Sequence, residues 1–135
     1  MRVYFKGSDK FFNKEEKKIL KDFTLMLQKH MPLSKDVHIY FIDYRKNDMT
    51  TGLRNPKHEL YVLSTHRMFV DVLRTLAHEW AHEFEHQKLK VKDKNVKEPQ
   101  IGTPEENFAN VLSGIMTKKF DYEYPQYKGV IYGED

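Results

Sequence analysis

The chain has 135 residues, a net charge of +3 and no Cys, and 39% of its residues are hydrophobic. Its nine Phe and eight Tyr indicate a packed core, and the length favours a single domain over residues 1–135. The lack of Cys excludes disulfides, Cys-ligated zinc and thiol catalysis. We find neither a signal peptide nor an apolar stretch of about 18 residues, so we expect a cytoplasmic protein without a membrane span.

The first half of the chain alternates between β-prone and helical patterns. Asn13 is a suitable N-cap, with acidic residues in the first turn of a helix that Pro32 ends. Two later runs are rich in β-branched and aromatic residues and are expected to pair antiparallel. The predicted elements are a short strand at 2–6, a helix from 14 to about 30, a strand at 37–44, a loop at 45–57 with room for a short strand at 49–53, and a strand at 58–64.

Two more helices are predicted in the second half. The later one has Thr103 as its N-cap, Pro104 at its first position and acidic residues in its first turn. We therefore expect an α+β fold in which a small, mostly antiparallel sheet packs on these helices. The predicted elements are a helix from 64 or 65 to about 90, a polar loop to 102, a helix from 103 to about 119, and a Tyr-rich tail or lid without helical period at 121–135.

The first of these helices carries the motif His78-Glu79-Trp80-Ala81-His82. Residues four apart on a helix share one face, about 6 Å apart along its axis, so both imidazoles can bind one Zn²⁺. Glu79 then lies where it can take a proton from a zinc-activated water, as in zinc hydrolases. The pattern also arises by chance on solvated helix faces, so a third ligand is needed to decide.

His86 continues the i, i+4 series but lies about 12 Å beyond His78, too far to share the ion. A third His ten residues after the first is the metzincin solution, but position 88 is Lys. Glu106, at the start of the next helix, is the preferred third ligand. Asn110, one turn later, is a candidate to bond the outer nitrogen of a ligand His.

Two alternatives to Glu106 as a ligand stay open. Thr103-x-x-Glu106 is also a capping box, in which Glu106 bonds back to the N-cap amide without any metal. Glu105 lies on the other side of the same helix and is the second candidate for the ligand role.

His78-Glu79-x-x-His82 followed by Glu106-x-x-Ala109-Asn110 resembles the small gluzincins of the ImmA/IrrE type. The resemblance covers about residues 37–119 and implies a minimal zincin-like fold, with His78, His82 and Glu106 as zinc ligands and Glu79 as general base. The chain departs from the family in its bulky Trp80 and in lacking a helix-turn-helix, so a partnership with a DNA repressor is unsupported. SprT-like proteases, which normally have His as third ligand, are a second resemblance.

The sequence thus predicts a zinc-dependent metallopeptidase that binds one Zn²⁺ and cleaves a peptide or protein substrate, which pairs with the 58–64 strand. The alternative is a zinc-stabilised regulatory or binding module with little proteolytic activity. Lys-rich runs at 14–18 and 88–94 are interrupted by acidic residues, and no nucleic-acid motif accompanies them. Candidates for the oxyanion-stabilising residue, each with packing as its other role, are Tyr122, Tyr124, Tyr127 and His66.

Overall fold

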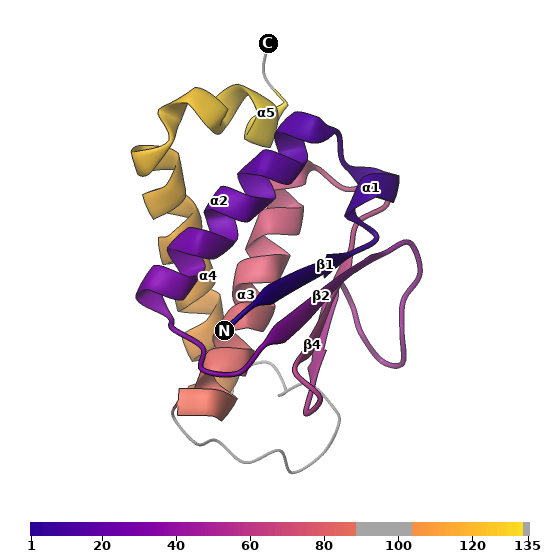
Figure 1. Ribbon diagram of the computed structural model, residues 1–135, viewed down its shortest axis with the longest axis vertical. Helices are drawn as coiled ribbons and strands as arrows, with labels where there is room; N and C mark the ends of the chain where they lie inside the picture. The colour runs from indigo at the N-terminus through magenta and orange to yellow at the C-terminus, as the bar shows by residue number, and fades with distance from the viewer. Residues whose placement is uncertain (89–103, 134–135) are drawn as a thin grey trace.

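A mixed sheet forms one layer of the molecule, and the long helices cover one of its faces (Figure 1). The computed structural model describes residues 1–88 and 104–133. Within these ranges the sheet has four strands in the order β1-β2-β4-β3. The strands are β1 (Val3–Lys6), β2 (Val37–Ile42), β3 (Gly52–Asn55) and β4 (Glu59–Leu63), and the longer helices are α2 (Lys14–His30), α3 (Phe69–Lys88) and α4 (Pro104–Glu123).

The direction of β4 corrects the sequence prediction. The strand predicted at 58–64 was expected to pair antiparallel with 37–44, but β2 pairs with both β1 and β4 in parallel. Only β3 and β4 form an antiparallel pair, so the expectation of a mostly antiparallel sheet is wrong. After β2, residues 43–51 carry the chain across the sheet to its far edge, beyond the position that β4 occupies. β3 then runs back along that edge. A hairpin from β3 then brings β4 back parallel to β2.

The prediction for α2 is confirmed at both ends. The Asn13 side chain accepts a bond from the Glu16 amide at 2.8 Å, and the Glu16 carboxylate accepts one from the Asn13 amide at 3.0 Å, which completes a capping box. The helix ends at His30, two residues before Pro32. One face of α2 packs into the core, which joins the helices to the inner face of the sheet. Its fully buried members include Ile19, Leu20, Phe23, Leu27, Ile39, Leu60, Leu73, Leu76 and Trp80.

The motif helix α3 begins at Phe69, later than the predicted 64 or 65. The amide of Ser64 donates to the Ile42 carbonyl, and His66 has a positive φ of 54°. A left-handed residue cannot sit inside an α-helix, so the chain turns here before the helix starts. Trp80, the bulky residue inside the motif, is fully buried, and its indole N–H donates to the Met31 carbonyl at the end of α2.

The prediction of an irregular tail at 121–135 is wrong for its described part. α4 continues to Glu123, and a 3₁₀ turn (Pro125–Tyr127) and α5 (Lys128–Tyr132) follow it. These two elements cross from α4 to α2 (Figure 1). The Tyr127 hydroxyl donates to Asp22 on α2 at 2.6 Å, and Ile131 is buried. The predicted loop at 90–102 and the N-cap Thr103 lie outside the described residues, as do 134 and 135. None of the helices described is both long and apolar enough to cross a bilayer.

Candidate metal centre

Three predicted ligands converge between α3 and α4. His78 and His82 lie one turn apart on α3, and their Nε2 atoms are 3.1 Å apart. Glu106, in the first turn of α4, places Oε1 3.0 Å from His78 Nε2 and Oε2 3.1 Å from His82 Nε2. Each residue offers a ligand atom within 4.8 Å of the others. The side chains of His78 and Glu106 are 18% and 14% exposed, so the cluster is open on one side.

The donor set fits a divalent metal in both size and chemistry. Tetrahedral zinc with ligand bonds of 2.0–2.1 Å places its ligand atoms about 3.3 Å apart, close to the observed spacing. Imidazole nitrogen and carboxylate oxygen are also the ligand types that zinc takes in sites with two His and one Glu. The same three groups can hydrogen-bond without a metal, each Nε2–H donating to one oxygen of Glu106.

The proposed base, Glu79, lies on the side of α3 that faces the sheet. Its side chain is rotated about 100° from that of His78 and is only 3% exposed. A Cβ built on Gly52 of β3 would lie 2.7 Å from Glu79 Oε2 and 2.7 Å from Thr75 Cγ2. The absence of a side chain at Gly52 therefore lets β3 approach the motif helix closely. β3 and α4 thus flank the two sides of the motif.

The outer ring nitrogen of His82 faces a residue that the sequence analysis did not consider for this contact. The buried carboxylate of Glu85 places Oε1 3.3 Å from His82 Nδ1, the ring nitrogen that faces away from Glu106. A metal-binding imidazole usually has a carboxylate beside this nitrogen, and here the two atoms form an ion-pair contact without hydrogen-bond geometry. Asn110, to which the prediction gave this role, is exposed, and no contact of its side chain with either His is seen in the described part of the chain.

No protein-family model, curated protein or solved structure matches this chain.

The structure also separates the alternative ligands. Glu106 belongs to the cluster, whereas Glu105 and His86 do not. Both carboxylate oxygens of Glu106 face imidazole nitrogens. Thr103, the N-cap of the competing capping box, lies outside the described residues.

A buried ionic cluster lies directly behind the motif, and the sequence analysis missed it. Glu83 is fully buried; its Oε1 accepts from Arg54 Nε at 2.9 Å and its Oε2 lies 2.6 Å from His58 Nδ1. Gln87 also donates to Glu83, and its own carbonyl accepts from the amides of residues 34 and 35. The sequence does indicate this cluster, because Glu83 falls at about 140° from His78 on the helical wheel, within the apolar arc. A carboxylate there needs a buried partner.

Two of the oxyanion candidates have structural roles. Tyr127 is buried and bonds to Asp22, and its ring stacks on that of Tyr124 at 5.4 Å between centroids. The hydrogen bond to Asp22 raises the pKa of Tyr127 to about 12. Tyr122 is exposed on α4, and His66 is exposed in the turn before α3. These positions do not single out an oxyanion-stabilising residue.

Proposed function

We propose that this chain is a zinc-dependent peptide hydrolase of the gluzincin kind, with a minimal zincin-like fold. The observation that carries the proposal is the mutual approach of His78, His82 and Glu106, with the carboxylate of Glu79 beside them on the same helix. A zinc ion held by these three residues would supply Lewis acidity, which polarises a carbonyl group and acidifies water.

Glu79 acts as the general base in this proposal. It accepts a proton from the attacking water and passes it to the leaving amine, as a carboxylate adjacent to the reacting atoms can do. Its burial and the contact with Gly52 restrict its rotamers. The negative charge of Glu85 lies 3.3 Å from His82 Nδ1 and stabilises the ring through this ion-pair contact.

In this proposal the peptide substrate pairs with β3, which is an edge strand, and not with the 58–64 strand predicted from the sequence. β4, which occupies 59–63, is bonded on both sides and has no open edge. The Leu63 amide donates to the Thr51 carbonyl at 2.8 Å, which sets the alternation of the β3–β4 ladder. The main-chain groups of Gly52 and Arg54 are therefore directed to the outer edge. A peptide strand bonded to Gly52 would lie beside Glu79.

The test separates metal binding from catalysis. The wild-type chain, loaded with zinc, is expected to cleave denatured casein or a mixed peptide library, with products identified by mass spectrometry. Glu79→Gln should retain zinc and lose at least 100-fold in turnover, because general-base catalysis contributes about 10²–10⁴-fold. His78→Ala should lose both zinc and cleavage.

Hydrolysis that survives Glu79→Gln unchanged would contradict the assignment of the base. A wild-type chain that retains zinc but cleaves no member of the library would instead favour the regulatory or binding module. A chain that binds no zinc would contradict both.

A further inference from the structure

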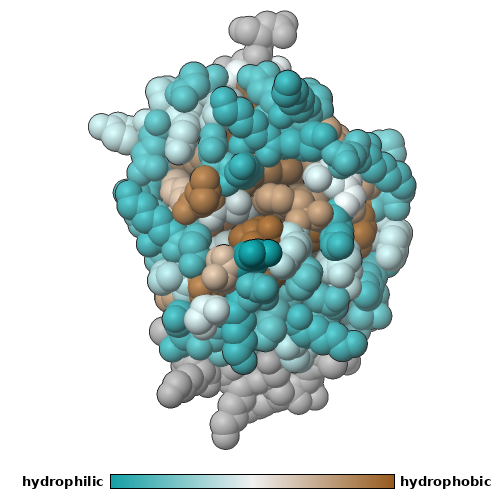
Figure 2. Space-filling view, viewed as in Figure 1, coloured by the Kyte–Doolittle hydropathy of each residue, from teal (hydrophilic) through white to brown (hydrophobic). Residues whose placement is uncertain are grey.

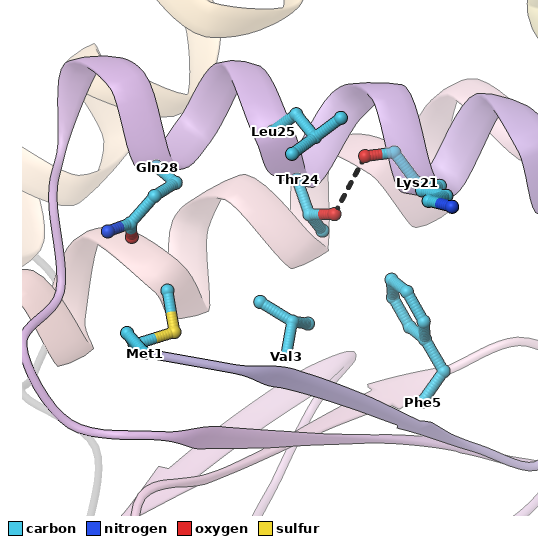
Figure 3. Close-up of a pocket in the computed structure, with 7 residues that line it drawn as sticks. All are labelled: Met1, Val3, Phe5, Lys21, Thr24, Leu25 and Gln28. Atoms are coloured by element: carbon cyan, nitrogen blue, oxygen red, sulfur yellow. Dashed lines mark hydrogen bonds between the residues drawn. The ribbon is translucent and has the colours of Figure 1, made fainter.

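The edge of the sheet farthest from the candidate metal centre borders an open groove between β1 and α2. Its volume is about 460 Å³, within the usual size of a binding site for a small ligand or a few side chains. Met1, Val3 and Phe5 point from the sheet side toward α2 (Figure 3). Leu25 and Lys21 line it from α2, and Leu25 is 62% exposed. Apolar surface gathers in this region, with hydrophilic residues around it (Figure 2).

The main chain of β1 has bonding groups available at this groove. The Val37 amide donates to the Arg2 carbonyl at 3.0 Å, and Val3 is the register partner of Val37. In a parallel ladder alternate residues bond to the neighbouring strand, so Arg2, Tyr4 and Lys6 face β2. The N–H and C=O groups of Val3 and Phe5 therefore face outward. No residue in the described ranges bonds to them.

The same two residues thus present both main-chain groups and apolar side chains to one ligand. A strand added beside β1 would place the side chains opposite Val3 and Phe5 in the groove, because directly opposed residues share a face of the sheet. Its alternate side chains would lie opposite Arg2, Tyr4 and Lys6, on the other face. The basic residues there, together with Lys21 at the groove, favour acidic side chains in the added strand.

In the register that overlaps the whole of β1, charge also disfavours a second copy of this chain as the occupant. In an antiparallel pair of β1 strands centred on Tyr4, Arg2 of each copy would lie opposite Lys6 of the other. Like charges directly opposed across two strands are destabilising.

We propose that the open edge of β1 and the groove beside it form a docking site for an extended acidic segment of another protein. The segment adds a fifth strand to the sheet and alternates apolar residues, which enter the groove, with acidic residues. This proposal is independent of metal binding and of hydrolysis, because the site lies on the opposite edge of the sheet from β3.

The test is an NMR titration of the full ¹⁵N-labelled chain with a capped peptide of alternating Glu and Val. The amides of Val3 and Phe5 should shift and become protected from hydrogen exchange. A matched peptide of alternating Lys and Val should bind at least 10-fold more weakly. Val3→Pro removes an outward N–H at the first residue of an edge strand, where Pro is tolerated, and should weaken binding at least fivefold.

A second variant keeps the test decisive if Val3→Pro does not fold. Leu25→Glu adds a negative charge at the groove and should also weaken binding at least fivefold. Its matched control is Val111→Glu on α4, where the side chain is 60% exposed and does not line the groove; binding should stay unchanged. Equal binding of the Glu and Lys peptides, or shifts centred on β3, would overturn the proposal. So would dimerisation of the free chain that Leu25→Glu abolishes, since a second copy would then be the occupant.

Discussion

The two edges of the sheet are built alike and differ in what the neighbouring helix presents. At each edge, two alternate residues direct their main-chain groups outward and their side-chain positions toward a helix: Gly52 and Arg54 in β3, Val3 and Phe5 in β1. At β3 the helix presents the carboxylates of Glu79 and Glu83. At β1 it presents Leu25 and Lys21. The chemistry of each edge is therefore set by the helix face beside it.

The match between β3 and α3 follows from simple dimensions. Two residues along a strand span about 6.8 Å, and four along a helix span about 6.0 Å. Gly52 and Arg54 can therefore meet Glu79 and Glu83 in succession. The groove beside β1 is open, and Lys21 has the only charged side chain among the described residues that line it. The contrast predicts that substitutions at the β3 edge cost stability and activity, whereas Leu25→Glu at the β1 groove affects only binding.

The largest expected effect comes from breaking the buried ion pair at the β3 edge. Arg54→Ala leaves Glu83 as an incompletely compensated buried charge and should lower the free energy of unfolding by about 3–5 kcal/mol. Urea unfolding measures the change. Arg74→Ala, which removes an exposed ion pair with Asp71, is the matched control and should leave the unfolding midpoint unchanged. Equal effects of the two substitutions would show that the buried pair does not hold β3 to the motif helix.

The next largest effect is a loss of zinc affinity when the contact between Glu85 and His82 is removed. Glu85→Gln should weaken zinc binding about 10–100-fold, because it removes the negative charge beside the ring of His82. Asn110→Ala should leave zinc affinity unchanged, since that side chain is exposed. Competition with a chromophoric chelator measures both affinities. The reverse result would restore the role that the sequence analysis gave to Asn110.

A smaller effect is expected where β3 approaches the motif helix. Gly52→Ala forces a methyl group against Glu79 and Thr75 and should cost about 1–3 kcal/mol of stability. Gly114→Ala is the control, because nothing lies within 4 Å of its added Cβ in α4. It should stabilise the chain by about 0.5–1 kcal/mol. Thermal unfolding compares them, and a neutral Gly52→Ala would contradict the close approach.

The smallest effect lies away from both edges. Tyr127→Phe removes the hydrogen bond to Asp22 and should cost about 1–2 kcal/mol at neutral pH. Because the pKa of Tyr127 is raised from 10.0 to about 12 in the folded chain, this contribution is complete below pH 10 and is lost as the pH rises through 12. Urea midpoints across pH 8–12 should converge for the two proteins. Zinc affinity and peptide binding should not change with Tyr127→Phe, because the residue belongs to neither edge.

Local patterns predicted the features that depend on neighbours in the sequence. Asn13 caps its helix through residues three positions away, and His78 and His82 face together because they are one turn apart. Glu106 was predicted from the next helix and does join the cluster. The direction of β4 was missed, because it depends on the path of residues 43–51 across the sheet. Gly52 was missed because its role exists only once β3 is packed against α3. Glu85 lies three residues after His82 on the same helix, so the helical spacing was sufficient to predict this contact.

The most direct test of the central claim is the zinc content of three proteins after dialysis against micromolar zinc. We expect one zinc ion per chain in the wild type and in Glu105→Gln, and a loss of zinc in Glu106→Gln. Inductively coupled plasma mass spectrometry gives the three ratios, and circular dichroism confirms that each variant is folded. A folded wild type without zinc, or a Glu106→Gln variant that retains as much zinc as Glu105→Gln, would contradict the site of His78, His82 and Glu106.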